Sequence, residues 1–287
     1  MHLSILGDRE GWHARDLERA ARSRGHEALH LDFQLLGHGL ACDWEKPQTD
    51  GLIVRTMPAG SLEQVVFRMD LLAAWERLGI RVVNRPKALE AAIDKFLSLE
   101  LLHREGLPVP PTIGCQDLTS AMLAFDRLGR DVVVKPLFGS EGRGMVRIQD
   151  EQIAWRVCHS ISRTGSVIYL QKFVENPGWD LRLFVLGHRV LGGMKRLAVN
   201  GDWRTNVAQG GKAEFYPPQR EECGLAVRAA RAVGAELAGI DLLRAQSGDW
   251  YVLEVNAVPG WRAFSKVTEI DVALEIVKYL ETGRKEN

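Results

Sequence analysis

The stretch of residues 239–256 reads GIDLLRAQSGDWYVLEVN, and it decides how the C-terminal half of the chain folds. Two runs of apolar residues, 239–244 and 250–255, flank a turn at Ser247-Gly248, so the stretch predicts a β-hairpin. Side chains alternate between the faces of a strand, which puts Glu254 and Asn256 on one face and brings Asp241 opposite them.

Two carboxylates and an amide oxygen that converge in this way are hard oxygen ligands of the kind Mg²⁺ prefers. The stretch therefore predicts a magnesium site at Asp241, Glu254 and Asn256. A carboxylate inside an apolar strand costs roughly several kcal/mol unless it is paired. An ion pair between Asp241 and a neighbouring arginine is the alternative.

A glycine-rich segment, Gly139-Ser140-Glu141-Gly142-Arg143-Gly144, follows an apolar strand predicted at 132–135. Its glycines would let backbone N–H groups approach an anion closely. It is neither a P-loop nor a GxGxxG motif, and a plain glycine-rich hairpin is the alternative. Lys135 ends the strand beside this segment and Lys95 starts a helix, so both can meet phosphate oxygens unless they are simply solvated.

The N-terminal third alternates strands and helices. Strands are predicted at 3–7, 27–33, 51–55 and 80–84, and helices at 12–23 and from a capping box at Ser61 to residue 78. This alternation predicts a mostly parallel sheet of four strands. One helix is expected over 87–105, and the prolines at 108, 110 and 111 mark a linker.

Beyond the linker, helices are predicted at 118–128, 152–162 and 219–233. Strands are predicted at 145–149 and 167–173, and a further hairpin pairs 181–186 with 190–196 through a turn at Gly187-His188.

Composition limits the class of protein. A chain of 287 residues with 46% hydrophobic and 26% charged residues is typical of a globular protein of two or three subdomains. Its 37 basic and 37 acidic residues give zero formal charge, which argues against nucleic acid or a membrane as partner. Four scattered cysteines without a CxxC pair argue against structural zinc or disulfides. No signal peptide or long apolar run is found, so a cytoplasmic location is expected.

One motif is misleading. His26-Glu27-Ala28-Leu29-His30 matches the HExxH pattern of zinc proteases, which requires a helix. Gly25 ends the preceding helix and the stretch has the pattern of a strand, so both histidines are expected to be surface groups.

Eight segments in order resemble the ATP-grasp ligases, most closely the RimK-type branch, which includes glutamate ligases acting on a ribosomal protein and on pterin cofactors. They are Asp94-Lys95, 133–136, the glycine segment, 171–175, 180–182, 203–206 with Gly210-Gly211, 239–241, and 253–257 with Pro259-Gly260. The resemblance covers about residues 85–280. It implies an α/β protein, α+β in the grasp, with a preATP-grasp domain at 1–90, a central subdomain at 91–174 and a C-terminal subdomain at 175–287.

The resemblance also implies site roles. Backbone groups of the hinge would hold adenine, Lys95 and Lys135 would reach phosphates, and the glycine segment would close over the triphosphate. Arg182 and Arg196 would hold an acylphosphate or a substrate carboxylate, unless they are exposed sheet arginines. Asp241, Glu254 and Asn256 match the family's magnesium ligands. The remaining nucleotide-binding residues are Ser140, Glu141, Gly142, Arg143 and Gly144 of the glycine segment, Lys172, Phe173 and Val174 of the hinge, and Asp180, Arg204, Thr205 and Asn206.

The implied reaction transfers a phosphoryl group from ATP to a carboxylate, and an amine then attacks the acylphosphate to form an amide. ATP and two Mg²⁺ ions, or Mn²⁺ in their place, are the expected cofactors. L-Glutamate and a small-molecule carboxylate acceptor are the expected substrates, and a homo-oligomer is left open. The alternatives are another ATP-grasp amino-acid or peptide ligase that modifies a protein or carrier, and a regulatory protein that binds nucleotide without chemistry.

Two departures from the family and one further likeness complete the comparison, and the last two bear on the acceptor. Lys172 stands where many relatives carry Glu, which would change a side-chain contact of the hinge only. Residues 261–266, WRAFSK, replace a smaller and more polar sequence of the ribosomal-protein enzyme. Residues 54–58 and 61–68 resemble the ligases that attach glutamate to tetrahydromethanopterin-type cofactors.

Overall fold

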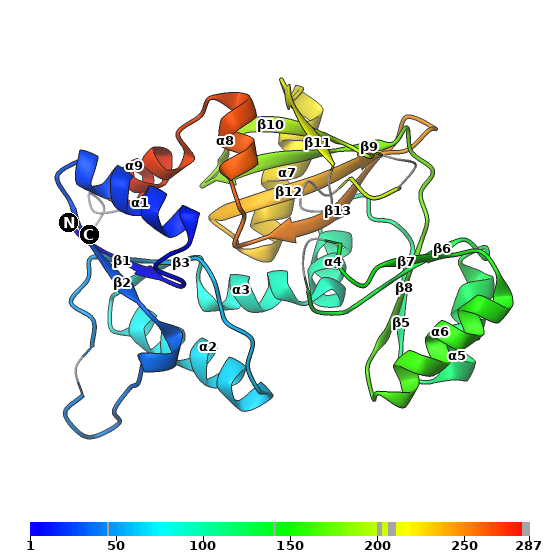
Figure 1. The fold of residues 1–287 in the computed structure, drawn as a ribbon, viewed down its shortest axis with the longest axis horizontal. Helices are drawn as coiled ribbons and strands as arrows, with labels where there is room; N and C mark the ends of the chain where they lie inside the picture. The colour runs from blue at the N-terminus through cyan, green and yellow to red at the C-terminus, as the bar shows by residue number, and fades with distance from the viewer. Residues whose placement is uncertain (45, 140–141, 200–202, 206–210, 283–287) are drawn as a thin grey trace.

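Three β-sheets form the framework of the molecule (Figure 1). The structure is a computed structural model, and it describes residues 1–44, 46–139, 142–199, 203–205 and 211–282. The sheets follow one another along the chain, and each is covered by helices.

The N-terminal sheet is parallel, with the strand order β2-β1-β3-β4, which confirms the predicted four-stranded α/β unit. Its strands are β1 (His2–Leu6), β2 (Glu27–Leu31), β3 (Gly51–Val54) and β4 (Arg81–Val83), with helices α1 (Trp12–Ser23) and α2 (Leu62–Arg77) and a short 3₁₀ helix η1 (Phe33–Leu35). The capping box predicted at Ser61 is present, because Ser61 Oγ accepts the N–H of Gln64 and the Gln64 side chain accepts the N–H of Ser61.

The helix expected over 87–105 is in fact two helices, α3 (Pro86–Ile93) and α4 (Lys95–Arg104). Asp94 lies between them with an extended backbone, and its carboxylate accepts the N–H groups of Phe96 and Leu97 at 2.9 and 3.1 Å. The apolar pattern runs through both helices, so the break comes from this N-cap. It places Lys95 on the first turn of α4.

The central sheet is antiparallel, with the order β5-β8-β6-β7. It is built from β5 (Thr112–Cys115), β6 (Val132–Lys135), β7 (Val146–Ile148) and β8 (Ile168–Lys172), with helices α5 (Leu118–Arg127) and α6 (Glu151–Arg163). One face packs Val132, Val134 and Leu170 against the two helices in a core of its own. The other face carries Val133, Lys135, Tyr169 and Gln171 toward the C-terminal sheet.

The C-terminal sheet has the order β11-β10-β9-β12-β13, and its pairings are antiparallel. Its strands are β9 (Trp179–Leu186), β10 (Arg189–Leu197), β11 (Lys212–Tyr216), β12 (Leu237–Arg244) and β13 (Trp250–Asn256). The apolar side chains of β9 and β12, such as Leu181 and Ile240, pack against α7 (Arg220–Val233) in the largest core. Polar side chains of the same strands therefore point to the opposite face.

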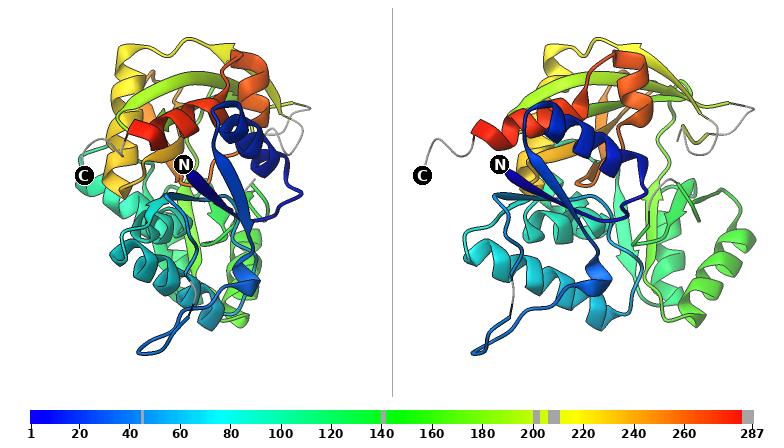
Figure 2. Two further views of the ribbon diagram at one scale, coloured as in Figure 1. Left: turned by 90° about the vertical axis from the view of Figure 1, so that its left-hand side faces the viewer. Right: turned by 60° about the vertical axis from the view of Figure 1, so that its left-hand side comes forward.

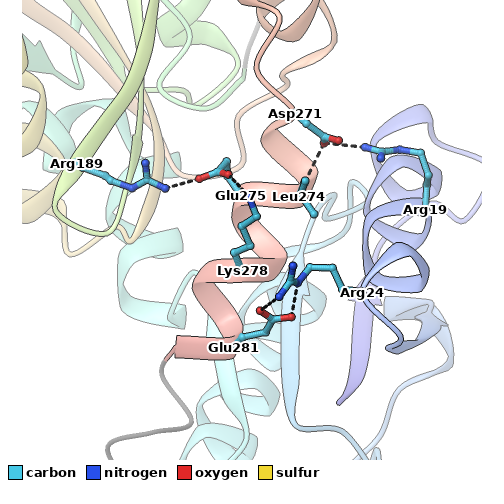
Figure 3. Close-up of polar contacts among 8 residues, drawn as sticks. All are labelled: Arg19, Arg24, Arg189, Asp271, Leu274, Glu275, Lys278 and Glu281. Atoms are coloured by element: carbon cyan, nitrogen blue, oxygen red, sulfur yellow. Dashed lines mark hydrogen bonds and ion pairs between the residues drawn. The ribbon is translucent and has the colours of Figure 1, made fainter.

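The chain ends by returning to its own N-terminal domain. After α8 (Arg262–Thr268), helix α9 (Val272–Thr282) lies alongside α1 (Figures 1 and 2). Arginine ion pairs link α9 and the preceding Asp271 to their surroundings, namely Arg19 with Asp271, Arg24 with Glu281 and Arg189 with Glu275 (Figure 3). Such exposed pairs contribute little. The buried apolar side chains of α9, Val272, Ile276, Val277 and Leu280, contribute more, at about 1.5–3 kcal/mol each for full burial.

Elements that the sequence pattern did not predict are β5, β11, α8 and α9. The predicted domain boundaries at 90/91 and 174/175 stay predictions. Over the described part of the chain, none of the helices combines the length and the hydropathy that crossing a membrane would require.

Asn84 joins the N-terminal sheet to the C-terminal sheet. Its Nδ2 donates to the carbonyls of Leu237 and Ala257, both at 2.6 Å, and its Oδ1 accepts the N–H groups of Glu236 and Leu237. The side chain is 1% exposed, so water cannot replace these bonds.

Asn84→Ala is expected to lower the free energy of unfolding by about 3 kcal/mol or more, because it leaves buried backbone groups without partners. Urea unfolding of the variant measures the loss, with Gln246→Ala, an exposed side chain, as the control. A loss no larger than that of the control would contradict the role given to Asn84.

Candidate active site

A cavity lies between the central and C-terminal sheets and collects most of the predicted site residues. Its floor and walls come from β6, β8, β9, β10, β12 and β13, together with α4 and the hinge after β8. The predicted residues that line it are Lys95, Lys135, Gly142, Arg143, Lys172, Phe173, Val174, Asp180, Arg196, Arg204, Thr205, Asp241 and Glu254.

Two lysines enter the cavity from different elements. Lys135 Nζ donates to Gln171 Oε1 at 2.6 Å, and burial lowers the pKa of Lys135 to about 8, although the charge of Glu254 opposes this. Lys95 Nζ donates to the carbonyl of Gly139 at 2.6 Å, and burial also lowers its pKa. An ammonium group has three N–H donors, so both lysines retain donors for an anion.

A row of charged side chains crosses the C-terminal sheet. The strand register pairs Arg182 of β9 with Asp241 of β12, and Asp241 with Glu254 of β13. Arg182 binds Asp241 through Nε and Nη2, both at 2.7 Å. A bulge after Asp241 pairs Leu242 with Val252, so Leu253 is the extra residue and Glu254 stays opposite Asp241.

The ion-pair alternative for Asp241 is therefore present in the structure. Arg196 adds a second contact to Asp241 at 2.9 Å. Burial would raise the pKa of Asp241, but Arg182 and Arg196 outweigh it and hold the pKa below its usual value. Three N–H groups occupy three of the roughly four lone-pair sites of a carboxylate, so Asp241 keeps room for one more ligand.

Asp180 and Arg196 form a second buried pair beside this row. Arg196 Nε and Nη2 donate to Asp180 at 2.7 and 2.6 Å, and Thr205 Oγ1 donates to the same carboxylate at 2.6 Å. Arg196 is only 3% exposed, so the suggestion that it is an exposed sheet arginine is wrong. Burial alone would lower the pKa of Arg196, but Asp180 and Asp241 raise it.

Glu254 is the carboxylate best suited to a metal. Its side chain lines the cavity, and among the described residues neither a hydrogen bond nor an ion pair engages it. The described residues hold no group of three or more His, Cys, Asp or Glu that could bind a metal alone. A magnesium ion here would thus use Asp241 and Glu254 with water or phosphate oxygens, which fits the chemistry of Mg²⁺.

Three predicted residues lie away from the cavity lining. Asn256 Oδ1 accepts the N–H of Val258 at 2.9 Å, so its amide is turned toward its own backbone. Arg182 is held behind Asp241. Gly144 has a φ of +73°, and a Cβ atom there would lie 3.0 Å from Pro136, which explains glycine at this turn. Ser140, Glu141 and Asn206 lie outside the described residues.

The hinge already uses two of its backbone N–H groups. Lys172 donates to the carbonyl of Pro111 at 2.8 Å, and Phe173 donates to that of Asp131 at 2.9 Å. The ring of Phe173 lies under the Arg147 guanidinium, 3.5 Å from the centroid, and meets Trp203 edge-on. These contacts fix the hinge at one end of the cavity.

Sequence reasoning missed several lining residues. Tyr169 and Gln171 alternate with apolar residues on β8 and face Lys135 and Val133 of β6. The period-two pattern of β8 puts Tyr169 and Gln171 on one face of the strand. Pairing of β8 with the strand that ends at Lys135 could have identified both as site residues. Trp203 also lines the cavity, and like Gln171 it was identified only as part of a motif.

Two other expectations are settled by contacts. His30 contacts Glu18 and His26 contacts Glu281, and Glu27–Leu31 is a strand, so the HExxH match does not describe a zinc site. Trp261 is fully buried against His13 and Phe184, so this residue belongs to the core.

Solved structures share this fold over nearly the whole chain. The ATP-grasp ligase PsnB, solved with a minimal precursor, superposes with a TM-score of 0.77 at 22% identity, covering 98% of both chains. D-Alanine–D-alanine ligase from Bacillus anthracis, solved with ATP, gives a TM-score of 0.73 at 18% identity, covering 100% and 99%. The fold is that of the ATP-grasp enzymes.

The sequence places the chain more narrowly. Residues 92–280 match the RimK-like ATP-grasp domain, and the chain belongs to this family. Tetrahydromethanopterin:alpha-L-glutamate ligase of Methanosarcina acetivorans is 33% identical over 96% of this chain and 97% of its own length. A probable alpha-L-glutamate ligase of Legionella pneumophila is 36% identical, covering 75% of this chain and 72% of that protein.

Lys135→Ala is expected to weaken ATP binding about ten- to a hundredfold, because it removes a charge-assisted contact to phosphate. In the protein without ATP, burial lowers the pKa of Lys135 to about 8. The affinity of the wild type for ATP should therefore fall as the pH rises above this value, and the variant should lose that dependence. Calorimetry at pH 7 and pH 9 measures both effects.

The control is Lys87→Ala, which removes an exposed lysine. If Lys135 were merely a solvated lysine, its replacement would change affinity by less than about 0.5 kcal/mol, as in the control.

Proposed function

We propose that this protein is an ATP- and Mg²⁺-dependent ligase that adds L-glutamate to a small-molecule acceptor of the pterin-cofactor type. The chemistry rests on one observation, the two lysines that face the row of Asp241 and Glu254 across a single cavity. The substrates rest on the similarity to the tetrahydromethanopterin ligase along the whole length of both chains.

The charges of the cavity suit a nucleotide. Arg182 and Arg196 neutralise Asp241 and Asp180, so among the described lining residues Lys95 and Lys135 face one further carboxylate, that of Glu254. The cavity therefore favours a polyanion such as the triphosphate of ATP. Lys95 and Lys135 would bind phosphate oxygens, and the glycine segment would close over them with backbone N–H groups.

Asp241 and Glu254 would hold magnesium, with Asn256 as a further ligand if its amide turns from Val258. Two Mg²⁺ ions are proposed, and Mn²⁺ would substitute. When bound, the metal neutralises charge on the transferred phosphoryl group.

The chain itself supplies positioning. In the proposed reaction, the acceptor carboxylate attacks the terminal phosphorus of ATP, giving an acylphosphate and ADP. The amine of glutamate then attacks the acyl carbon and displaces phosphate. Arg196 lines the cavity and binds Asp180 through Nε and Nη2, so its Nη1 group is the donor that would hold the acylphosphate. Arg182 binds Asp241 through Nε and Nη2 from outside the lining, and it would reach the acylphosphate only after a rearrangement of its side chain. This route needs no protein nucleophile.

We place the enzyme in the cytoplasm, in line with its sequence. Modification of a protein or carrier in place of a small molecule is the alternative that the assay below separates.

The assay measures ADP release from purified protein with ATP, Mg²⁺, L-glutamate and tetrahydromethanopterin. Release of ADP and phosphate is expected only when both substrates are present, with a glutamyl adduct detected by mass spectrometry. AMP and pyrophosphate as products would refute the acylphosphate route. ADP release with a peptide or carrier as the only acceptor would show that the acceptor is not a small molecule.

Glu254→Gln keeps the size of the side chain and removes one negative charge. We expect a melting temperature close to that of wild type and loss of turnover, partly restored by excess Mg²⁺, because the metal is held less well. Thermal unfolding and a magnesium titration of activity measure the two effects. If Glu254 were a structural ion-pair partner, the variant would instead unfold early.

A further inference from the structure

Arg55 is a buried cation with most of its donors unused. It follows β3 directly, and it is 6% exposed. Nη2 donates to the carbonyl of Pro259 at 3.0 Å, whereas Nε and Nη1 are buried and have no hydrogen-bond partner among the described residues. These two atoms carry three of the five N–H groups of a guanidinium. Such orphaned donors are rare in folded proteins and require an explanation.

No carboxylate neutralises Arg55 among the residues that the structure describes. The guanidinium lies over the ring of Trp261, 4.3 Å from its centroid. Asp16 is nearby but is occupied, since it accepts Trp261 Nε1 at 2.8 Å and pairs with Arg19. Burial lowers the pKa of Arg55 to about 9, which reflects the missing counter-charge.

His13 lies close to Arg55 and carries no charge. His13, on the first turn of α1, accepts the N–H of Trp261 through Nε2 at 3.0 Å. Burial, together with the charges of Arg55 and Arg262, lowers its pKa to about 4, so it stays neutral.

The position of Arg55 connects it to the active site. It lies at the carboxyl end of a parallel strand, where open α/β sheets bind ligands. Pro259, which accepts its hydrogen bond, also flanks Gly239 on β12. A Cβ atom at Gly239 would lie 3.1 Å from Pro259 Cβ and 3.7 Å from Arg182 Cδ. Pro259 and Gly239 therefore link Arg55 to Arg182, the arginine that binds Asp241.

We propose that Arg55 is a specificity residue that binds a non-reacting carboxylate of a substrate at the junction between the N-terminal sheet and the grasp. This inference rests on the proposed function, in which both glutamate and the acceptor are carboxylates. The carboxylate would take the free donors of Arg55, with displacement of the segments that cover them. Arg55 does not line the cavity that holds Asp241 and Glu254, so this carboxylate would take no part in the phosphoryl transfer.

The test compares Arg55→Met with Arg68→Met. Arg68 is a matched control, because it is also a buried arginine of the N-terminal domain, lies over the ring of Phe33 and donates to a proline carbonyl, that of Pro58. Calorimetry measures binding of L-glutamate in one arm and tetrahydromethanopterin in the other, each with Mg²⁺ and a non-hydrolysable ATP analogue. Arg55→Met should weaken one of the two about ten- to a hundredfold, and Arg68→Met neither.

Stability provides a second readout. Because Arg55→Met removes a buried cation without a counter-charge, its melting temperature without ligand should equal or exceed that of wild type. A purely structural arginine would give the reverse, early unfolding with unchanged ligand affinity.

The outcomes separate cleanly. Loss of glutamate affinity assigns the carboxylate to the amino acid, and loss of tetrahydromethanopterin affinity assigns it to the acceptor. The inference is overturned if wild type binds neither, if Arg55→Met binds both as wild type does, or if both variants weaken alike. Unchanged KM values in an active Arg55→Met enzyme would overturn it while leaving the proposed function intact. Ligand binding that depends on Arg55, without any ADP release, would support the inference and overturn the proposed function.

Discussion

The buried charge row on the C-terminal sheet is the constraint on which the active site depends. An isolated buried charge costs several kcal/mol even after relaxation, so each member of the row requires its partner. Arg196 bridges Asp180 and Asp241, and Arg182 holds Asp241 from the other side. A register slip of one residue would turn these groups into the apolar layer under α7. Electrostatics and packing therefore select the same strand register.

That register determines which charges remain for chemistry. Since the two arginines are matched by the two aspartates, Glu254 is left to interact across the cavity with Lys135 of the central sheet and Lys95 of helix α4. Different contacts hold the three sheets in place. The central sheet has its own core with α5 and α6, whereas the N-terminal and C-terminal sheets share two cores and the hydrogen bonds of Asn84.

Local sequence signals predicted most of the regular structure. Alternation identified the strands of all three sheets except β5 and β11, and capping at Ser61 placed the start of α2. The pattern failed where a distant contact decides the structure. Helix α9 is stable because its apolar face packs against α1, more than 200 residues earlier in the chain. Asp94 was recognised as part of a motif, but its capping of α4 cannot be separated from a continuous helix by periodicity alone.

The candidate site was predictable in composition and less so in geometry. The hairpin at 239–256 correctly implied that Asp241 faces Glu254, because register follows from alternation across one turn. It could not show that Asp241 is shared by two arginines, because both lie outside the hairpin. Arg182 is on β9, which pairs with β12, and Arg196 is on β10, which pairs with β9. The turn of the Asn256 amide toward Val258 depends on the backbone after β13, which no strand pattern describes.

Arg55 and Lys135 illustrate why the unexplained charges of a fold point to ligands. A protein optimised only for stability would pair a buried cation or replace it with an apolar side chain, and both changes are accessible by single substitutions. Lys135 keeps one hydrogen bond to Gln171 and Arg55 one to Pro259, and burial lowers the pKa of each. Lys135 belongs to the central sheet, and Arg55 directly follows a strand of the N-terminal sheet. An anion bound at Lys135 and another at Arg55 would give these two cations the counter-charge that Arg182 and Arg196 of the C-terminal sheet already have.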